Sequence, residues 1–142
     1  METDLIQKYI VSNAFGKWLE MDFEVKSEGL VYYTIIIKNT HLATPKAAHG
    51  GVIAAFVDAA LGVAGLSAIA KDQKVVSTIE YKLNFLSPAF LDDELLAIGK
   101  VEQKGNRILI SSCDVFCKNR NNVLIAKALG TFNIYDAVKA GY

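Results

Sequence analysis

The sequence predicts an α+β domain in which an antiparallel β-sheet wraps around one long buried helix. A nearly continuous apolar segment of small residues runs from His49 to Ala70, and it is too long for an ordinary strand. Stretches rich in β-branched and aromatic residues lie on both sides of it, two before and four after. Short polar turns separate these stretches, which is typical of consecutive strands in an antiparallel sheet.

Each element has its own local signal. Thr3 can cap a short helix over Leu5–Val11, and Gly16 indicates a break soon afterwards. The polar residues from Lys71 to Lys74 end the long helix, and Pro88 lies in a later connection. The predicted strands are Leu19–Lys26, Val31–Lys38, Val75–Leu86, Glu94–Gln103, Ile108–Lys118 and Val123–Tyr135, with turns at Ser27–Gly29, Lys104–Asn106 and Asn119–Asn122.

Composition narrows the class of protein. A chain of 142 residues, 52% of them hydrophobic, fits one domain over residues 1–142 with a sizeable core. Lys plus Arg and Asp plus Glu both number 15, so no net charge attracts nucleic acid or an anionic membrane. The first ten residues include acidic side chains where a signal peptide carries basic ones, and no uninterrupted apolar run follows, so we expect a cytoplasmic protein.

Asp58 is the one charged residue in the apolar segment and the leading candidate for chemistry. An ionised carboxylate in apolar surroundings costs several kcal/mol unless it is paired, hydrogen-bonded or used. Its presence also argues against a membrane span, because insertion of an Asp near the centre costs about 2.5 to 3.5 kcal/mol. The structural alternative is a buried polar residue at a helix–helix dimer contact.

Gly50 and Gly51 precede Asp58 at the expected start of the helix. The first N–H groups of a helix have no partner within it, and the helix dipole places partial positive charge there. Glycine lets a carbonyl approach the backbone closely, so both residues are candidates for binding a substrate carbonyl or oxyanion. The alternative is that the two glycines only turn the chain into the helix.

The spacing between Gly50 and Asp58 has a consequence for assembly. Eight helical residues span about 12 Å, whereas a reacting carbon must lie about 3 Å from both groups. One helix therefore cannot supply both to one substrate. If both act, Gly50 of one subunit works with Asp58 of another, which predicts a dimer with two equivalent sites.

The segment HLATPKAAHGGVIAAFVDAALG, followed by STIEYKLNFLSPA, resembles the hotdog-fold acyl-CoA thioesterases of the phenylacetate-pathway (PaaI-like) type. Their pattern is His-Gly-Gly, six residues, then Asp. The resemblance implies a hotdog fold, hydrolysis of an acyl-CoA to a carboxylic acid and free CoA, no cofactor or metal, and a homodimer or a dimer of dimers. It implies that Asp58 acts as nucleophile or general base while the Gly50 amide polarises the carbonyl.

The resemblance also points to further site residues. Counting back from Ser87-Pro88-Ala89, the position of a helpful hydroxyl is Thr78, although Thr is also an ordinary strand residue. His49 belongs to the same motif, but an imidazole at a helix start can instead cap a backbone amide. The residues expected to contact the CoA ester are Phe85, Leu86, Ser87 and Pro88, together with the turn residues Gly105, Asn106 and Arg107. That turn can equally be a solvated hairpin tip.

The chain departs from the family pattern in the loop before the helix. Ala43 and Lys46 replace an Asn and a Gly, and the missing Asn amide puts the rate and the substrate in question. Two alternatives therefore stay open: a non-catalytic acyl-CoA binder or sensor, and a hotdog dehydratase or hydratase. The latter needs an acid–base pair, for which Asp58 has only His49 as a partner.

Other reactive and aromatic residues receive structural interpretations. Cys113 and Cys117 lie about 13 Å apart on an expected strand, which excludes a disulfide and a shared metal. His41 and His49 have no third ligand. Phe15, Trp18 and Phe56 could line an acyl slot, but a place in the core is the preferred interpretation.

Overall fold

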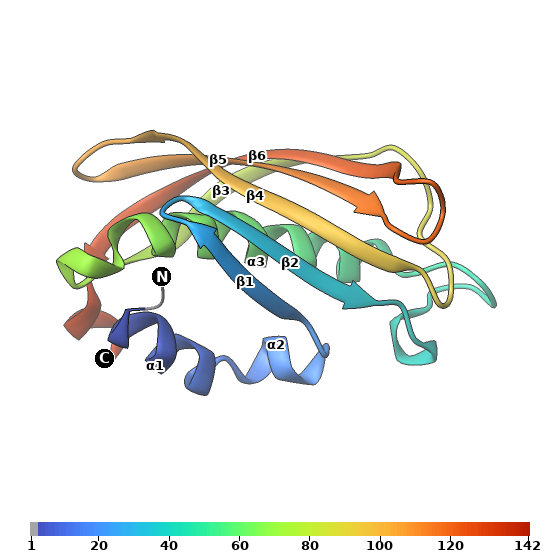
Figure 1. The fold of residues 1–142 in the computed structure, drawn as a ribbon, viewed down its shortest axis with the longest axis horizontal. Coiled ribbons are helices and arrows are strands. Elements are labelled where there is room, and N and C mark those ends of the chain that lie inside the picture. The colour runs from blue at the N-terminus through green and yellow to red at the C-terminus, as the bar shows by residue number, and fades with distance from the viewer. Residues whose placement is uncertain (1–2) are drawn as a thin grey trace.

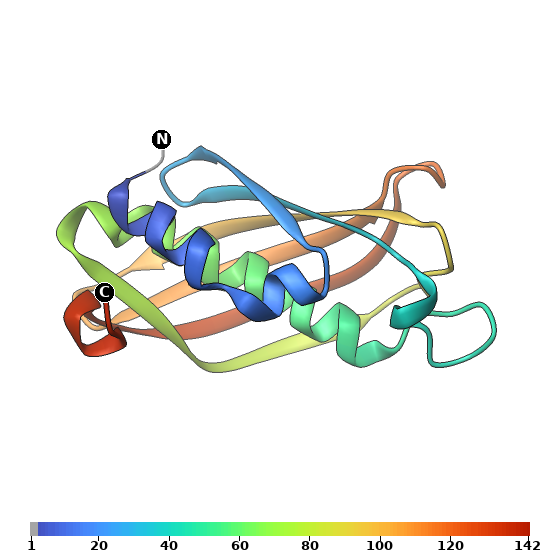
Figure 2. The ribbon, with the colours of Figure 1, turned by 90° about the horizontal axis from the view of Figure 1, so that it is seen from below.

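A computed structural model describes residues 3–142 of the chain. One six-stranded antiparallel sheet curves around the long helix α3, Gly50–Ile69, and two short helices cover the opposite side of α3 (Figures 1 and 2). The strands, in the sheet order β1-β2-β4-β5-β6-β3, are β1 Asp22–Ser27, β2 Leu30–Ile36, β4 Glu94–Lys104, β5 Ile108–Cys117, β6 Val123–Asp136 and β3 Lys74–Phe85. The arrangement of the sheet around one helix agrees with the sequence prediction.

The N-terminal segment differs from the prediction at Gly16. Helix α1, Asp4–Ser12, is capped by Thr3 as expected, but a second helix, α2 (Ala14–Trp18), follows at once. Asn13 ends the first helix, and its side chain accepts a hydrogen bond from the Gly16 N–H at the start of the second. Gly16 is therefore buried inside α2, where a Cβ would collide with Asn13, and does not mark a break.

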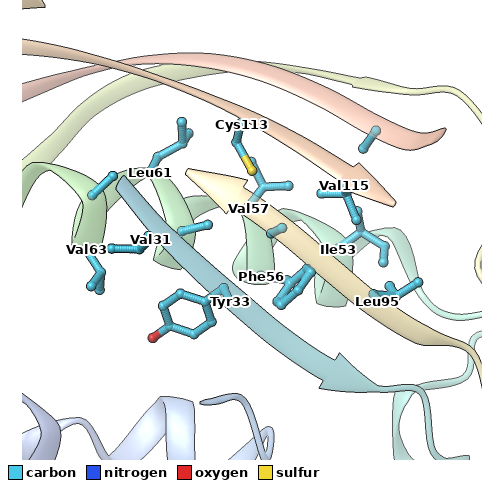
Figure 3. Close-up of a cluster of buried hydrophobic side chains, with 14 of the residues drawn as sticks. Val31, Tyr33, Ile53, Phe56, Val57, Leu61, Val63, Leu95, Cys113 and Val115 are labelled. Carbon is cyan, nitrogen blue, oxygen red and sulfur yellow. The ribbon is translucent and has the colours of Figure 1, made fainter. Parts of the chain in front are cut away.

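Helix α3 is apolar because protein surrounds most of it. It is long and apolar enough to span a membrane by composition, yet most of its side chains are buried. Phe56, Val57 and Leu61 are fully buried against inward-facing side chains of β2, β4 and β5 (Figure 3). Phe56 is thus a core residue, as predicted.

Phe15 and Trp18 are not in the core. Both belong to α2, where their side chains are 56% and 75% exposed and their rings lie 6.2 Å apart. The prediction failed because an aromatic residue near a glycine in a short segment gives no helical periodicity from which to choose the buried face.

A close approach between helix and sheet fixes the position of α3. Gly99 of β4 lies where an added Cβ would be 2.3 Å from the carbonyl oxygen of Ala60. The absence of a side chain at Gly99 therefore lets the sheet touch the helix backbone one half-turn beyond Asp58.

Strand β3 forms one edge of the sheet and lies beside α3. It pairs with β6 on one side only, and a β-bulge interrupts the register between Thr78 and Glu80. The bulge changes the alternation of side chains, so that Thr78 and Tyr81 both reach α3, although residues three apart on a regular strand face opposite sides.

Candidate active site

Asp58 and Thr78 lie in direct contact. Thr78 Oγ1 donates a hydrogen bond of 2.7 Å to Asp58 Oδ1, and this bond joins the middle of α3 to β3. Asp58 is half-buried, and its Oδ2 atom accepts no hydrogen bond from residues 3–142. One carboxylate oxygen is therefore held in place by Thr78, and the other is available to hydrogen-bond a substrate or water.

A cavity of about 340 Å³ opens beside this pair. Its walls come from α1, α3, β3, β6 and the C-terminal segment, and they are mainly apolar, with Gly62, Leu66 and Phe132 among them. The phenol of Tyr9 also lines it, and burial raises the pKa of this group, with the charge of Asp58 adding to the effect. Burial and the same carboxylate raise the pKa of Tyr81 as well. Both phenols therefore stay neutral beside Asp58.

Gly50 is the first residue of α3, and its N–H has no hydrogen-bond acceptor within the described part of the chain. His49, the N-cap, is extended, with φ −63° and ψ 136°. A second cavity, about 230 Å³, lies in front of Gly50. It is lined by residues that the sequence assigned to substrate binding, namely Phe85, Leu86, Ser87 and Pro88.

His49 and Gly51 are hydrogen-bonded to each other, so these two groups are not both free to bind a ligand. The His49 Nδ1 atom accepts a hydrogen bond of 2.7 Å from the Gly51 N–H. His49 therefore fulfils the capping role that the sequence left open, and the Gly51 amide is already used. Both line a third cavity, about 330 Å³, together with Phe15 and Trp18.

The hairpin turn Gly105–Arg107 lies at the other end of the sheet from Gly50 (Figure 1). Its three residues are exposed and line none of the three cavities described above. Within one chain, the structure therefore does not bring Arg107 to either Asp58 or Gly50. Ala43 and Lys46, where the chain departs from the pattern, are exposed in the loop before α3.

Asp58 and Gly50 face different cavities of the same chain. Eight residues of helix separate them by about 12 Å along the α3 axis. A single chain thus presents the acid and the free amide as two half-sites.

Sequence reasoning missed two features around these half-sites. Tyr9 reaches the Asp58 cavity from α1, and no local pattern links the two residues. A partly buried ion pair also lies next to the Gly50 cavity. Arg120 donates to both carboxylate oxygens of the buried Asp93, at 2.9 and 2.7 Å, and to the Pro88 carbonyl at 3.0 Å. In the sequence, Asp93 and Arg120 are two charged residues in separate turns, far apart along the chain, and no motif links them.

The two thiols lie outside these cavities. Cys113 and Cys117 are free and buried in the core, and burial raises the pKa of Cys113 to about 12. Among residues 3–142, no three His, Cys, Asp or Glu side chains gather closely enough to hold a metal ion.

Residues 46–124, which include α3, match the family model of the thioesterase superfamily. The chain belongs to the thioesterase superfamily. This confirms the family expected from the His49-to-Asp58 pattern. The chain is also 31% identical over 104 residues to a putative esterase of Archaeoglobus fulgidus; the match covers 73% of this chain and spans 64% of the archaeal protein.

Solved structures of this superfamily share the fold. The chain superposes on PaaI of Escherichia coli, from its phenylacetic acid degradation operon, with a TM-score of 0.81 at 20% identity, covering 89% and 88% of the two chains. A thioesterase of Haemophilus influenzae gives 0.83 at 18% identity, over 100% and 96%. A hypothetical thioesterase of Streptococcus pneumoniae, solved with coenzyme A, gives 0.76 at 20% identity, over 92% and 97%. The expected hotdog fold is confirmed.

Proposed function

We propose that this protein is an acyl-CoA thioesterase that hydrolyses a thioester to a carboxylic acid and free CoA. The observation that carries the proposal is the carboxylate of Asp58, held by Thr78 at the mouth of an apolar cavity in a chain of the thioesterase superfamily. The Streptococcus pneumoniae neighbour contains coenzyme A, which supports a CoA ester as the substrate of this chain.

Asp58 would act in one of two ways. It either accepts a proton from a water molecule that attacks the thioester carbon, or attacks that carbon itself and forms an anhydride that water then cleaves. In both routes the carbon–sulfur bond breaks and the CoA sulfur leaves with a proton. Negative charge develops on the carbonyl oxygen, and the free N–H of Gly50 is suited to stabilise it.

The complete site would form between two chains. We propose that two copies pair along the free edge of β3, so that the Asp58 half-site of one faces the Gly50 half-site of the other. An unpaired edge strand of 12 residues favours such pairing, and Ile79 and Phe85 on it are 54% and 57% exposed. A two-fold dimer would contain two such sites, and a dimer of dimers is the further assembly consistent with the family resemblance.

The deciding experiment measures free thiol released from a panel of acyl-CoAs. We expect release by the wild-type protein and a loss of at least about a hundredfold in Asp58→Ala. Cys113 and Cys117 are buried, so the protein itself should give little background with a thiol reagent. Absence of release from every ester, with tight binding of CoA esters, would favour the sensor.

A hydratase would give a different result when the same panel of acyl-CoAs is tested. It would consume the absorbance of an enoyl-CoA without releasing thiol.

Single-turnover hydrolysis in ¹⁸O-labelled water separates the two routes for Asp58. Direct attack by water puts label into the first acid molecule. Attack by the carboxylate, followed by attack of water on the Asp58 carbonyl of the anhydride, puts label into the protein first.

A further inference from the structure

The cavity beside Asp58 runs along the helix and away from the carboxylate. Asp58, Gly62 and Leu66 are spaced four residues apart, so they lie on one face of α3, and all three line the cavity. This face extends about 12 Å from the carboxylate to Leu66. Strand β3 forms the opposite wall, with Thr78 at the Asp58 end and Val75 farther along.

The two ends of the cavity differ in exposure. Thr78 and Ser77 are exposed at the Asp58 end, where a substrate can enter. Leu66 and Val75 at the far end are 4% and 5% exposed, and they pack against Leu5 of α1, which is 1% exposed. The cavity therefore has an open mouth at the carboxylate and a closed apolar end.

The closed end depends on segments from both termini of the described chain. Tyr142 lines the cavity, and its hydroxyl lies 2.8 Å from the Ser12 hydroxyl at the end of α1. Its backbone N–H bonds to the Ala137 carbonyl at 3.2 Å. These contacts hold α1 and the last residues together over the cavity and limit its depth.

We propose that this cavity, called here the acyl chamber, receives the acyl group of the thioester and selects an apolar acyl group of medium size. The inference rests on the proposed function. A thioester carbon placed at Asp58 would direct its acyl group along the face of Gly62 and Leu66, because the apolar walls lie in that direction.

The volume sets the size of the acyl group. A cavity of 150 Å³ accommodates benzene, so a cavity of about 340 Å³ holds roughly eight to twelve carbon atoms. An acetyl group would leave most of the apolar surface unfilled, and a palmitoyl group exceeds the space. Octanoyl, decanoyl and arylalkanoyl groups are the class that fits.

Gly62 is the residue that determines this specificity. It stands one helical turn beyond Asp58, and a Cβ added there would lie 3.5 Å from Phe132 Cε2, which is an ordinary contact distance. A Cβ at this position therefore fits without displacing the sheet, and a valine would add two further methyl groups beside the acyl chamber.

The test compares acyl-chain profiles of the wild-type protein, Gly62→Ala and Gly62→Val. We expect kcat/KM for thiol release to peak at eight to twelve carbons. In Gly62→Val, the ratio of kcat/KM for decanoyl-CoA to that for acetyl-CoA should fall about tenfold. Gly62→Ala should show a smaller shift in the same direction, and it keeps the test usable if the valine variant folds poorly. The matched control is Ala55→Val, on the same helix but facing the His49 cavity.

Binding of S-decyl-CoA and S-ethyl-CoA, thioethers that cannot be hydrolysed, separates failure of the chamber from failure of the proposed function. Tighter binding of the decyl ether, lost in Gly62→Val, supports the acyl chamber even if no ester is hydrolysed. A chain-length profile that is flat, or that is the same in Gly62→Val and the wild type, overturns it while thiol release still supports the thioesterase.

Discussion

The backbone N–H of Gly50 is a residue-scale feature that can be removed without changing the helix. Gly50 is the first helical residue, where proline is well accommodated, and the extended backbone of His49 suits a following proline. A Cβ at Gly50 would meet the Phe85 ring at 3.6 Å, an ordinary contact. Gly50→Pro and Gly50→Ala therefore differ mainly in whether the N–H is present.

We predict that Gly50→Pro lowers kcat for thioester hydrolysis by about 10²- to 10³-fold, the usual effect of losing one oxyanion donor. Gly50→Ala should retain activity within about tenfold, because it keeps the donor. Steady-state kinetics of the two variants makes the measurement. Equal activity of both variants would show that the Gly50 amide does not bind the carbonyl.

The ion pair of Asp93 and Arg120 is the second residue-scale feature. The Asp93 side chain is only 5% exposed, and this desolvation alone would raise its pKa. Hydrogen bonds from Arg120 and from the Phe90 N–H outweigh that effect, so that the pKa of Asp93 lies below its usual value of 3.8. Arg120 of this pair contacts the Phe90 ring and the carbonyl of Pro88, which lines the Gly50 cavity.

A carboxyl group whose pKa is lower in the folded than in the unfolded protein stabilises the fold at pH values above its unfolded-state pKa. This stabilisation is lost as the pH falls through the folded-state pKa. We therefore predict that, as the pH falls below about 4, the free energy of unfolding decreases more steeply in the wild type than in Asp93→Asn. Arg120→Met should cost about 2–4 kcal/mol at neutral pH, because it leaves the buried carboxylate unpaired. Urea unfolding at a series of pH values measures both effects, and parallel pH curves would contradict the first.

At the scale of elements, β4 and α3 pack so closely at Gly99 that an added methyl group does not fit between them. We predict that Gly99→Ala destabilises the fold by about 1–3 kcal/mol, because its Cβ would stand 2.3 Å from the Ala60 carbonyl oxygen and force helix and sheet apart. Gly62→Ala is the matched control, since it adds the same methyl group to a position with room. Thermal unfolding of both variants measures the difference. A Gly99→Ala variant as stable as the control would show that the contact relaxes freely.

The elements also show what could be predicted from sequence. Strands with polar turns between them and a long alanine-rich helix are local patterns, and the structure has them close to the predicted ends. The first strand begins later than Leu19, at Asp22, because α2 continues to Trp18 and Glu20 follows in a left-handed conformation. Short helices joined by one shared cap, Asn13, give no periodicity long enough to recognise.

The candidate site also has a part that could be predicted from the sequence and a part that could not. The His49-to-Asp58 spacing and the strand position of Thr78 are local, and the structure brings Thr78 to Asp58. The residues that close the cavity depend on tertiary packing: Tyr9 and Tyr142 come from opposite ends of the sequence and meet only because α1 crosses under α3 (Figure 2). No spacing rule could assign them to the site.

At the scale of the whole molecule, the proposed dimer predicts that a charge on the free edge of β3 separates the subunits. Ile79 is exposed at the bulge of this strand and makes no core contact. We expect Ile79→Arg to sediment as a monomer, to remain folded, and to lose thioesterase activity by about a hundredfold or more. Val138→Arg, on an exposed residue outside the sheet, is the control. An active monomer would contradict the shared site.

The same model predicts complementation between two inactive proteins. In a mixed dimer of Asp58→Ala and Gly50→Pro, one composite site carries both defects and the other carries neither. Refolding the two variants together should therefore restore part of the wild-type rate, whereas each variant alone keeps only its low residual rate. Sites confined to single chains would show no recovery.

Trp18 is an intrinsic fluorescent probe in this protein. It is the only tryptophan of the chain, it is 75% exposed, and it lines the cavity of His49 at the start of α3. Its fluorescence emission should be that of an indole in water for an isolated chain. A shift to shorter wavelength on concentrating the protein would mean that another molecule covers α2.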